Sequence, residues 1–359
     1  MSSDLSNLLI GRDASIRDAA ACLDRSARGI VLVVEADQRL LSTITDGDIR
    51  RAMLAGVNLD GPISQVLQRK EDSPYRTPVT APSDTERPVL LRMMQERKVR
   101  QIPLLDEAGR VVELVTLSEL LPDEVLPIEA VIMAGGYGKR LMPLTKELPK
   151  PMLPIGDRPL MQVMIEQLRQ SGIRRVNVMT HYQHEKITDY FGDGKAFGVE
   201  MRYVAEDQPL GTAGGLGLIK TSDDPILVVN GDILTRVDFR TMLDYHRKHK
   251  ADITVAVRQY DVQLPYGVLE CENHQVRKVR EKPLLNFFVN AGIYLIEPSM
   301  HQYIPNEQSF DMTDLIQRLL DDGRSVVSFP ILEYWLDIGQ HQDYEQAQKD
   351  LRDGELSLT

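Results

Sequence analysis

Apolar and mixed stretches alternate along the C-terminal part of the chain and predict an alternation of strands and helices. Short apolar runs, such as residues 130–133 and 225–230, have the length and composition of buried strands. Longer segments between them repeat their apolar residues every three or four positions, which is the period of an amphipathic helix. The predicted strands cover residues 130–133, 176–180, 199–204, 225–230, 253–257, 326–329 and 332–335, and the predicted helices cover 160–170, 185–191, 213–219, 239–249 and 342–351.

This alternation predicts an α/β fold with a Rossmann-like, mostly parallel sheet and helices on both faces. Ligands of such sheets bind at the carboxyl ends of the strands. Residues 267–296 are instead rich in strands and turns, and we expect them to form an insertion that folds over one side of the sheet.

The N-terminal part of the chain contains an internal repeat. Residues 31–49 align without gaps on residues 102–120, since 102 − 31 and 120 − 49 both give 71. Each half contains two strands around a polar turn and the start of a helix, and an amphipathic helix precedes each, at residues 15–25 and 84–96. Half an α+β layer cannot bury its own apolar face, so the two halves should pack as a pair.

A short run rich in prolines and acids, residues 120–127, separates the two patterns and marks a domain boundary. We therefore predict an N-terminal domain at residues 1–122, a linker at 123–128 and a C-terminal domain at 129–359.

Glycines follow the first strand of the C-terminal domain and carry the first candidate chemistry. Gly135, Gly136 and Gly138 lack a Cβ, so the main chain can take positive φ values and turn its N–H groups toward an anion. Arg140 follows, and Lys150 lies between two prolines that hold its backbone extended. This pattern is typical of a polyphosphate site, and the alternative is a glycine-rich turn without a ligand.

Two familiar phosphate loops do not match this segment. A Walker A loop would need Gly at Met133 and Ser or Thr at Arg140. A dinucleotide-binding fingerprint would need a third glycine at Leu141, so only its first half is present.

Two aspartates follow apolar strands farther along the chain. Asp232 comes after residues 226–230 and a glycine, and Asp337 comes after Trp335 and Leu336. Mg²⁺ prefers one or two carboxylates together with substrate phosphates. Either aspartate alone could be a helix cap or turn residue, but both together with the cations of the glycine segment favour a cation-assisted phosphate site.

Charge and composition narrow the choice of partners. The net charge of −11 argues against nucleic acid or an anionic membrane surface as the main partner. No apolar run approaches the ~20 residues that span a bilayer, and the N-terminus does not resemble a signal peptide, so we expect a cytoplasmic protein. His246 and His249 have no third metal ligand nearby and are expected on a solvated helix face.

The segments AGGYGKRLMPLTKELPKPMLP, LGTAGG, VVNGDI, EKP, NAGIY and WLDIG, in this order, resemble the sugar-1-phosphate nucleotidyltransferases from about residue 130 to the C-terminus. Lys139 departs from the family, which usually has Thr or Ser at this position. The resemblance implies a GT-A-like domain that transfers a nucleotidyl group from a nucleoside triphosphate to a sugar 1-phosphate with Mg²⁺. The residues themselves leave GTP, UTP and dTTP open.

The resemblance also implies roles for individual residues. Arg140, Lys150 and Lys282 would be catalytic, and Asp232 and Asp337 would bind Mg²⁺. The triphosphate and base would be bound by Ala134, Gly135, Gly136, Gly138, Lys139, Gln208, Gly211 and Thr212. The sugar phosphate would be bound by Tyr266, Gly267, Glu281, Lys282, Asn290 and Gly292.

The N-terminal repeat resembles a tandem pair of cystathionine-β-synthase (CBS) domains, in which Thr45 and Asp48 would hold the ribose of an adenine nucleotide. The second half keeps Thr116 but has Glu119 in place of the aspartate. Asp48 could equally be a helix N-cap without a ligand, and the pair could be a dimerisation module.

The combination of a CBS pair with this catalytic domain resembles bacterial guanylyltransferases that supply GDP-sugars. It implies GTP with glucosamine-, mannose- or heptose-1-phosphate, and a homo-oligomer. The alternatives are a UTP- or dTTP-dependent glucose-1-phosphate enzyme and a non-catalytic, nucleotide-sensing subunit. Retention of the predicted site residues argues against the non-catalytic subunit.

Overall fold

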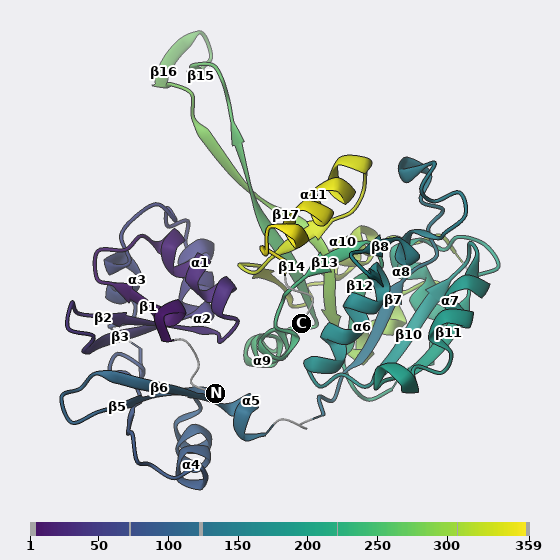
Figure 1. Cartoon of the computed structure of the whole chain (residues 1–359). Helices are drawn as coiled ribbons and strands as arrows, with labels where there is room; N and C mark the ends of the chain where they lie inside the picture. Colours follow the sequence, from purple (N-terminus) through teal and green to yellow (C-terminus); the bar gives the residue numbers. More distant parts are fainter. Residues whose placement is uncertain (1–4, 72, 122–124, 221, 307, 357–359) are drawn as a thin grey trace. The chain divides into compact units, whose positions relative to one another are not determined.

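The computed structural model describes residues 5–71, 73–121, 125–220, 222–306 and 308–356, which form two compact units (Figure 1). The first unit comprises Met1–Leu126 and Leu332–Tyr334, and the second comprises Pro127–Ile331 and Trp335–Thr359. The division after Leu126 falls within the predicted linker, and residues 123 and 124 of that linker lie outside the described residues. The prediction places Leu332–Tyr334 in the C-terminal domain, whereas the structure groups them with the N-terminal unit.

The N-terminal unit contains the same supersecondary motif twice. In each half a short strand pairs in parallel with a central strand, which pairs antiparallel with the next. The boundaries of the main elements are displaced by the predicted offset, since 87 − 16, 101 − 30 and 111 − 40 all give 71. The first half contains β1 (Leu9–Gly11), α1 (Ile16–Ser26), β2 (Ile30–Val34), β3 (Leu40–Thr45), α2 (Asp46–Leu54) and α3 (Ser64–Arg69), and the second contains β4 (Ala81–Pro82), α4 (Arg87–Arg97), β5 (Gln101–Leu105), β6 (Val111–Thr116) and α5 (Leu117–Leu120).

The two halves pack as a pair, as predicted. Equivalent turns meet each other: the Leu40 N–H donates to the Gly109 carbonyl at 3.1 Å, and the Val111 N–H donates to the Gln38 carbonyl at 3.4 Å. Beside them, Leu32 of the first half lies in one buried cluster with residues of β6 from the second. Burial of this shared apolar surface stabilises the pair.

The second unit is built on a seven-stranded sheet in the order β11-β10-β7-β12-β17-β14-β18. Only β17 runs antiparallel to its neighbours, so the predicted mostly parallel α/β fold is confirmed. The strands are β7 (Glu129–Met133), β10 (Arg175–Thr180), β11 (Glu200–Ala205), β12 (Ile226–Asn230), β14 (Ile253–Gln263), β17 (Leu284–Ile296) and β18 (Val326–Pro330).

The central strands of this sheet are buried on both faces. Ile226 and Val228 of β12 belong to an apolar cluster with Leu315 of α10 (Met312–Asp321). Leu227 and Val229 point to the opposite face and are also buried, because successive strand residues alternate between faces. The other long helices of this unit are α6 (Leu160–Gln170), α7 (His184–Phe191), α9 (Phe239–His249) and α11 (His341–Arg352). The structure has no single helix at 213–219, where one was predicted, but two short turns, α8 (Gly211–Gly214) and η5 (Gly215–Leu218).

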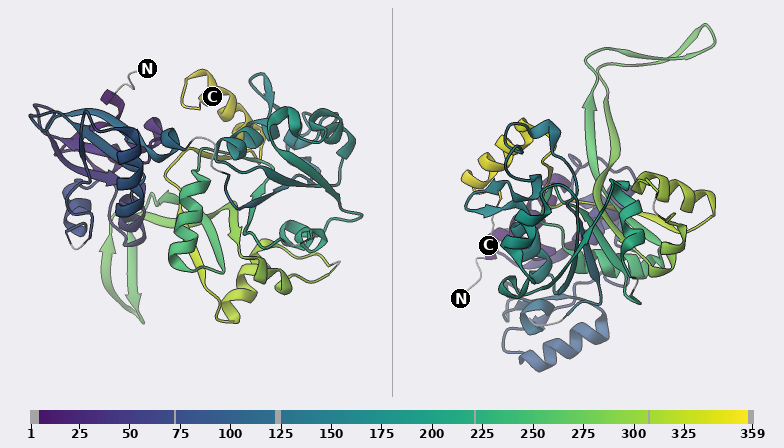
Figure 2. Two further views of the ribbon diagram at one scale, coloured as in Figure 1. Left: turned by 90° about the horizontal axis from the view of Figure 1, so that it is seen from below. Right: turned by 90° about the vertical axis from the view of Figure 1, so that its right-hand side faces the viewer.

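The predicted insertion does not fold over the sheet. Strands β14 and β17 continue past the sheet as a long two-stranded ribbon, which ends in the hairpin of β15 (Val268–Glu272) and β16 (Gln275–Arg280) and projects away from the rest of this unit (Figures 1 and 2). Strand pairing is interrupted at residues 264–267 and 281–283.

The prediction of a solvated face for His246 is wrong. Its side chain is 1% exposed, and its ring nitrogens lie 2.8 Å from the Thr254 hydroxyl and 3.0 Å from the Glu297 carboxylate. Burial lowers the pKa of His246, and the neighbouring Glu297 offsets part of that effect. The histidine is therefore a hydrogen-bonded core residue.

No helix in the described parts of the chain is long and apolar enough to cross a membrane.

Candidate active site

The glycine segment connects β7 to a short 3₁₀ helix, η2 (Lys139–Leu141), and the site begins there. Of the three glycines predicted to turn the chain, only Gly138 has a positive φ, at 62°. A methyl group on Gly138 would come within 2.8 Å of the Thr145 side chain, whose hydroxyl donates to the Gly138 carbonyl. Gly136 has open space where a side chain would be, so packing does not explain its identity. That space leaves room for a ligand.

The two cations of η2 have different surroundings. The Lys139 ammonium lies 5.4 Å from the centre of the Tyr137 ring, a cation–π contact within the loop itself. Arg140 is exposed, and its guanidinium and the Asp337 carboxylate both lie beside Gly339: a methyl group there would be 3.9 Å from Arg140 Nη1 and 3.7 Å from Asp337 Oδ1. Arg140 thus faces the predicted metal ligand, whereas Lys139 packs on its own loop.

An ion pair joins the loop region to the end of β12. Lys150 begins the 3₁₀ helix η3 (Lys150–Met152), and its ammonium donates to Asp232 Oδ2 at 2.6 Å. Gly231, just before Asp232, packs closely against the end of β7, because a methyl group there would lie 2.6 Å from the Met133 carbonyl oxygen. The other oxygen, Asp232 Oδ1, is buried and has no hydrogen-bond partner among the described residues. An unsatisfied buried acceptor of this kind indicates a missing partner.

Asp337 lies beside this ion pair. It ends β19 (Trp335–Asp337), which pairs antiparallel with β13 (Ile233–Thr235) so that Asp337 is opposite Ile233. The Ile338 N–H donates to the Asp232 carbonyl at 3.0 Å. Although the residue keeps an exposed edge, partial desolvation and then repulsion from Asp232 raise the pKa of Asp337, while Lys150 and Arg140 act in the opposite direction.

These two carboxylates fit a magnesium ion that also binds substrate phosphates. Asp232 has an oxygen without a partner, and a divalent cation would relieve its repulsion with Asp337. The described residues contain no group of three or more His, Cys, Asp or Glu side chains placed to hold a metal. The remaining ligands would then come from substrate and water.

Of the residues predicted to bind the nucleotide base, Gly211 and Thr212 have contacts within the protein that explain their identity. Gly211 has a φ of 78°, and a methyl group there would lie 2.7 Å from Asp311. The Thr212 N–H donates to Asp311 at 3.0 Å, and its hydroxyl accepts from the Met312 N–H at 2.8 Å, which ties this turn to the start of α10. Gln208 is exposed.

Sequence reasoning missed Glu206, two positions before Gln208. Glu206 is half-buried, and its Oε1 has no hydrogen-bond partner among the described residues. Methyl groups on Gly135 and Gly215 would come within 3.0 Å and 2.5 Å of its carboxylate, which therefore lies between the glycine segment and the turn of α8 and η5. Burial raises its pKa, against opposing effects of His181 and the Leu210 N–H.

A polar chain holds Glu206 beside the glycine segment. The Tyr137 hydroxyl lies 2.9 Å from His181 Nε2, and His181 Nδ1 lies 2.8 Å from the Glu206 carbonyl oxygen. The only advance signal in the sequence is an acidic residue just after a predicted strand, which is too common to single out.

The residues predicted for the sugar phosphate are divided between two places. Tyr266, Gly267, Glu281 and Lys282 lie together at the interruption of the β14–β17 ribbon, where Tyr266 is 76% exposed. Asn290 and Gly292 lie in β17 next to β12: a methyl group on Gly292 would be 2.7 Å from the Asn230 amide nitrogen. Among the described residues, no contact joins the ribbon residues Tyr266, Gly267, Glu281 and Lys282 to Asp232.

In the N-terminal unit, the predicted ribose-binding residues form helix caps. Thr45 and Asp48 make a capping box at the start of α2, and Asp48 also pairs with Arg51 at 2.5 Å. Thr116 and Glu119 make the equivalent box at α5, where Glu119 pairs with Arg28. The capping interpretation, one of the two alternatives for Asp48, thus describes its contacts in this structure.

Comparisons with known proteins match both units. Residues 129–354 match the nucleotidyl transferase family model, and residues 3–55 and 74–122 match the CBS domain. A UTP–glucose-1-phosphate uridylyltransferase of Synechocystis is 35% identical over 241 residues, which cover 61% of this chain and 62% of that enzyme. The match therefore spans less than two thirds of that relative.

Two further relatives match nearly their whole length. The D-glycero-α-D-manno-heptose 1-phosphate guanylyltransferase of Aneurinibacillus thermoaerophilus is 34% identical, over 63% of this chain and 99% of that enzyme. A crystal structure assigned as a glucose-1-phosphate thymidylyltransferase of Bacillus anthracis, with sucrose, has a TM-score of 0.53 and 27% identity, covering 63% of this chain and 96% of that one.

Replacement of Arg140 by lysine tests its predicted role at the triphosphate. The charge is kept but the planar fork of donors is lost, and a charge-assisted hydrogen bond is worth about 1.5–3 kcal/mol. We expect Arg140→Lys to slow pyrophosphate release from a nucleoside triphosphate at least about tenfold. The exposed Arg202→Lys, on β11, is the matched control. Near-normal pyrophosphate release by Arg140→Lys would show that the guanidinium of Arg140 does not have the predicted role at the triphosphate.

Proposed function

Because the chain belongs to the nucleotidyl transferase family and carries a pair of CBS domains, we propose that it transfers a guanylyl group from GTP to a sugar 1-phosphate. The observation that supports this most is the clustering of Lys150, at the start of η3, with Asp232 and Asp337, which lie at the ends of two strands from distant parts of the chain. Glucosamine-, mannose- or heptose-1-phosphate is the proposed acceptor class.

In the proposed reaction, a phosphate oxygen of the sugar 1-phosphate attacks the α-phosphorus of GTP. A phosphorus–oxygen bond forms there as the bond between the α-phosphorus and the departing pyrophosphate breaks. The nucleophile is already anionic, so no side chain needs to remove a proton. Positioning and charge neutralisation then account for catalysis.

Bringing the two anions together requires cations. Two unit charges about 4 Å apart repel by roughly 4 kcal/mol at an effective dielectric near 20. We assign Arg140 to the triphosphate, Lys150 to the phosphates beside Asp232, and Lys282 to the sugar phosphate. Asp232 and Asp337 would hold Mg²⁺, which when bound would supply further positive charge to the phosphates.

Glu206 supports GTP over the other triphosphates. Guanine presents two adjacent donors, N1–H and the N2 amino group, which match the two oxygens of a carboxylate. Uracil and thymine present a single N–H between two carbonyl oxygens, and those oxygens would repel the carboxylate. Because Glu206 Oε1 is buried without a hydrogen-bond partner among the residues that the structure describes, a base that offers donors would satisfy it. The relatives named above use different bases, so this choice depends on residues of this chain.

The experiment is a matrix of pyrophosphate-release rates with four nucleoside triphosphates, several sugar 1-phosphates and Mg²⁺. We expect GTP to be used fastest. In Glu206→Gln, one guanine-facing acceptor becomes a donor, so kcat/KM for GTP should fall about tenfold or more while that for UTP does not. Glu200→Gln, an exposed residue of β11 paired with Arg202, is the control.

The outcomes separate the alternatives. If the wild type uses UTP or dTTP faster than GTP, the proposed choice of GTP is wrong, but nucleotidyl transfer remains the reaction. Absence of turnover with every pair would favour the non-catalytic, nucleotide-sensing subunit.

We also propose that the CBS pair binds an adenine nucleotide near Thr45, Asp48 and Thr116. Binding would require Asp48 to exchange its present contacts with Thr45 and Arg51 for ribose hydroxyls. In a thermal-unfolding series of the full chain with AMP, ADP and ATP, a ligand at a hundredfold excess over its Kd should stabilise by about 2.7 kcal/mol. No shift with any of them would favour a purely structural pair.

A further inference from the structure

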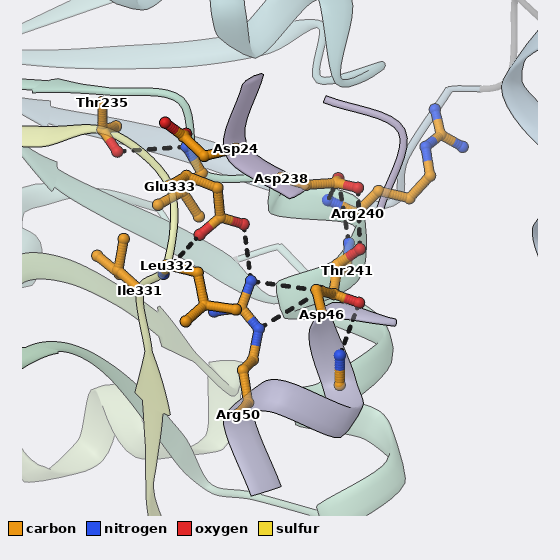
Figure 3. Close-up of polar contacts among 12 residues, drawn as sticks. Asp24, Asp46, Arg50, Thr235, Asp238, Arg240, Thr241, Ile331, Leu332 and Glu333 are labelled. Atoms are coloured by element: carbon orange, nitrogen blue, oxygen red, sulfur yellow. Dashed lines mark hydrogen bonds and ion pairs between the residues drawn. The ribbon is translucent and has the colours of Figure 1, made fainter. Parts of the chain in front are cut away.

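Three consecutive residues near the C-terminus belong to the N-terminal unit, although the residues on both sides of them belong to the second unit. Leu332, Glu333 and Tyr334 group with that unit, and we call them the anchored segment. Leu332 packs against the apolar core around α1 and α2. Glu333 accepts a hydrogen bond from Arg50 of α2 at 2.7 Å (Figure 3), and the Tyr334 N–H donates to Asp24 of α1 at 2.9 Å. Each residue of the segment is thus held by a different kind of contact.

The ion pair of Arg50 is buried. Its side chain is 1% exposed, and its guanidinium also lies 3.3 Å from Asp46, one turn earlier in α2 (Figure 3). Burial by itself would lower the pKa of Arg50, but Glu333 and Asp46 more than offset this and leave the pKa above its ordinary value. A charge buried in this way needs its partners, because an uncompensated one is strongly destabilising. Exposed pairs contribute far less.

The anchored segment leads directly into the strand that carries Asp337. Trp335, the first residue of β19, follows Tyr334. β19 pairs with β13 through three residues on each strand, and so short a two-stranded sheet has little stability of its own. Within the same unit, the Trp335 indole N–H also donates to the Ala291 carbonyl at 2.9 Å, and the Ile338 N–H to the Asp232 carbonyl at 3.0 Å. The position of Asp337 beside Asp232 depends on these few contacts together with how the residues just before β19 are held.

We propose that Arg50 is a positioning residue for the nucleotidyl-transfer site: by holding Glu333 it fixes the start of β19 and hence the position of Asp337 beside Asp232. The helix that carries Arg50 begins at the Thr45–Asp48 capping box, so a change at the start of α2 would reach the cation pair through the anchored segment. This inference rests on the proposed function only in taking Asp337 as a cation ligand.

The test uses the full chain with Glu333→Gln and Arg50→Met, and Arg69→Met as the control. Arg69 is an exposed residue at the end of α3, in the same half of the N-terminal unit. Two properties are measured: hydrogen exchange of the amides of residues 335–338, by mass spectrometry, and Mn²⁺ affinity, by electron paramagnetic resonance. We expect both variants to exchange faster and to bind Mn²⁺ at least about fivefold more weakly, with the control unchanged.

Both substitutions remove the same ion pair, between Arg50 and Glu333. The double variant should therefore show no faster exchange and no weaker Mn²⁺ binding than the more severely affected single variant. Glu333→Gln leaves Arg50 paired with Asp46, so it carries the test if Arg50→Met does not fold. Wild-type exchange and Mn²⁺ affinity in folded Glu333→Gln would overturn the proposal, as would a lower unfolding temperature with neither property changed. Failure of the proposed function would look different: without a cation site the wild type itself would bind no Mn²⁺, and a different reaction would appear in the pyrophosphate-release rates of the wild type.

Discussion

The ion pair between Lys150 and Asp232 is the contact on which the account of this site depends. It joins the segment after β7 to the end of β12, and one oxygen of Asp232 is buried without a hydrogen-bond partner among the described residues. Asp337 lies beside this pair, on a strand that pairs with β13. The proposed cation site rests on this buried oxygen and on the second carboxylate next to it.

Much of the fold could be predicted from the sequence, because it follows from local patterns. Periodicity located α6 and α9 at their observed bounds, and the repeat offset located both halves of the N-terminal unit. The strand ends after β7 and β12 were recognisable because apolar runs there stop at glycines. In a mostly parallel sheet those ends meet at one edge, so Lys150 and Asp232 could be expected to be close.

The remaining features depend on contacts between distant residues, which carry no local signal. Glu206 is notable only because its carboxylate lies between two glycine turns. His246 has the spacing of a solvated helix position, yet Thr254 and Glu297 bury it. Leu332–Tyr334 look like the start of a strand, but their contacts with residues far away in sequence, among them the pair of Glu333 with Arg50, group them with the N-terminal unit. The ribbon departs from the sheet because paired strands can continue beyond the layer that they help to form.

The most direct test of the cation site is an Mn²⁺ titration of the wild type and Asp232→Asn, each with and without GTP. The account predicts that GTP tightens Mn²⁺ binding to the wild type, since phosphates would complete the ligand set. It also predicts that Asp232→Asn weakens binding at least about tenfold, or about 1.4 kcal/mol. Equal Mn²⁺ affinity in the two proteins, with no effect of GTP, would contradict a cation site at Asp232 and Asp337.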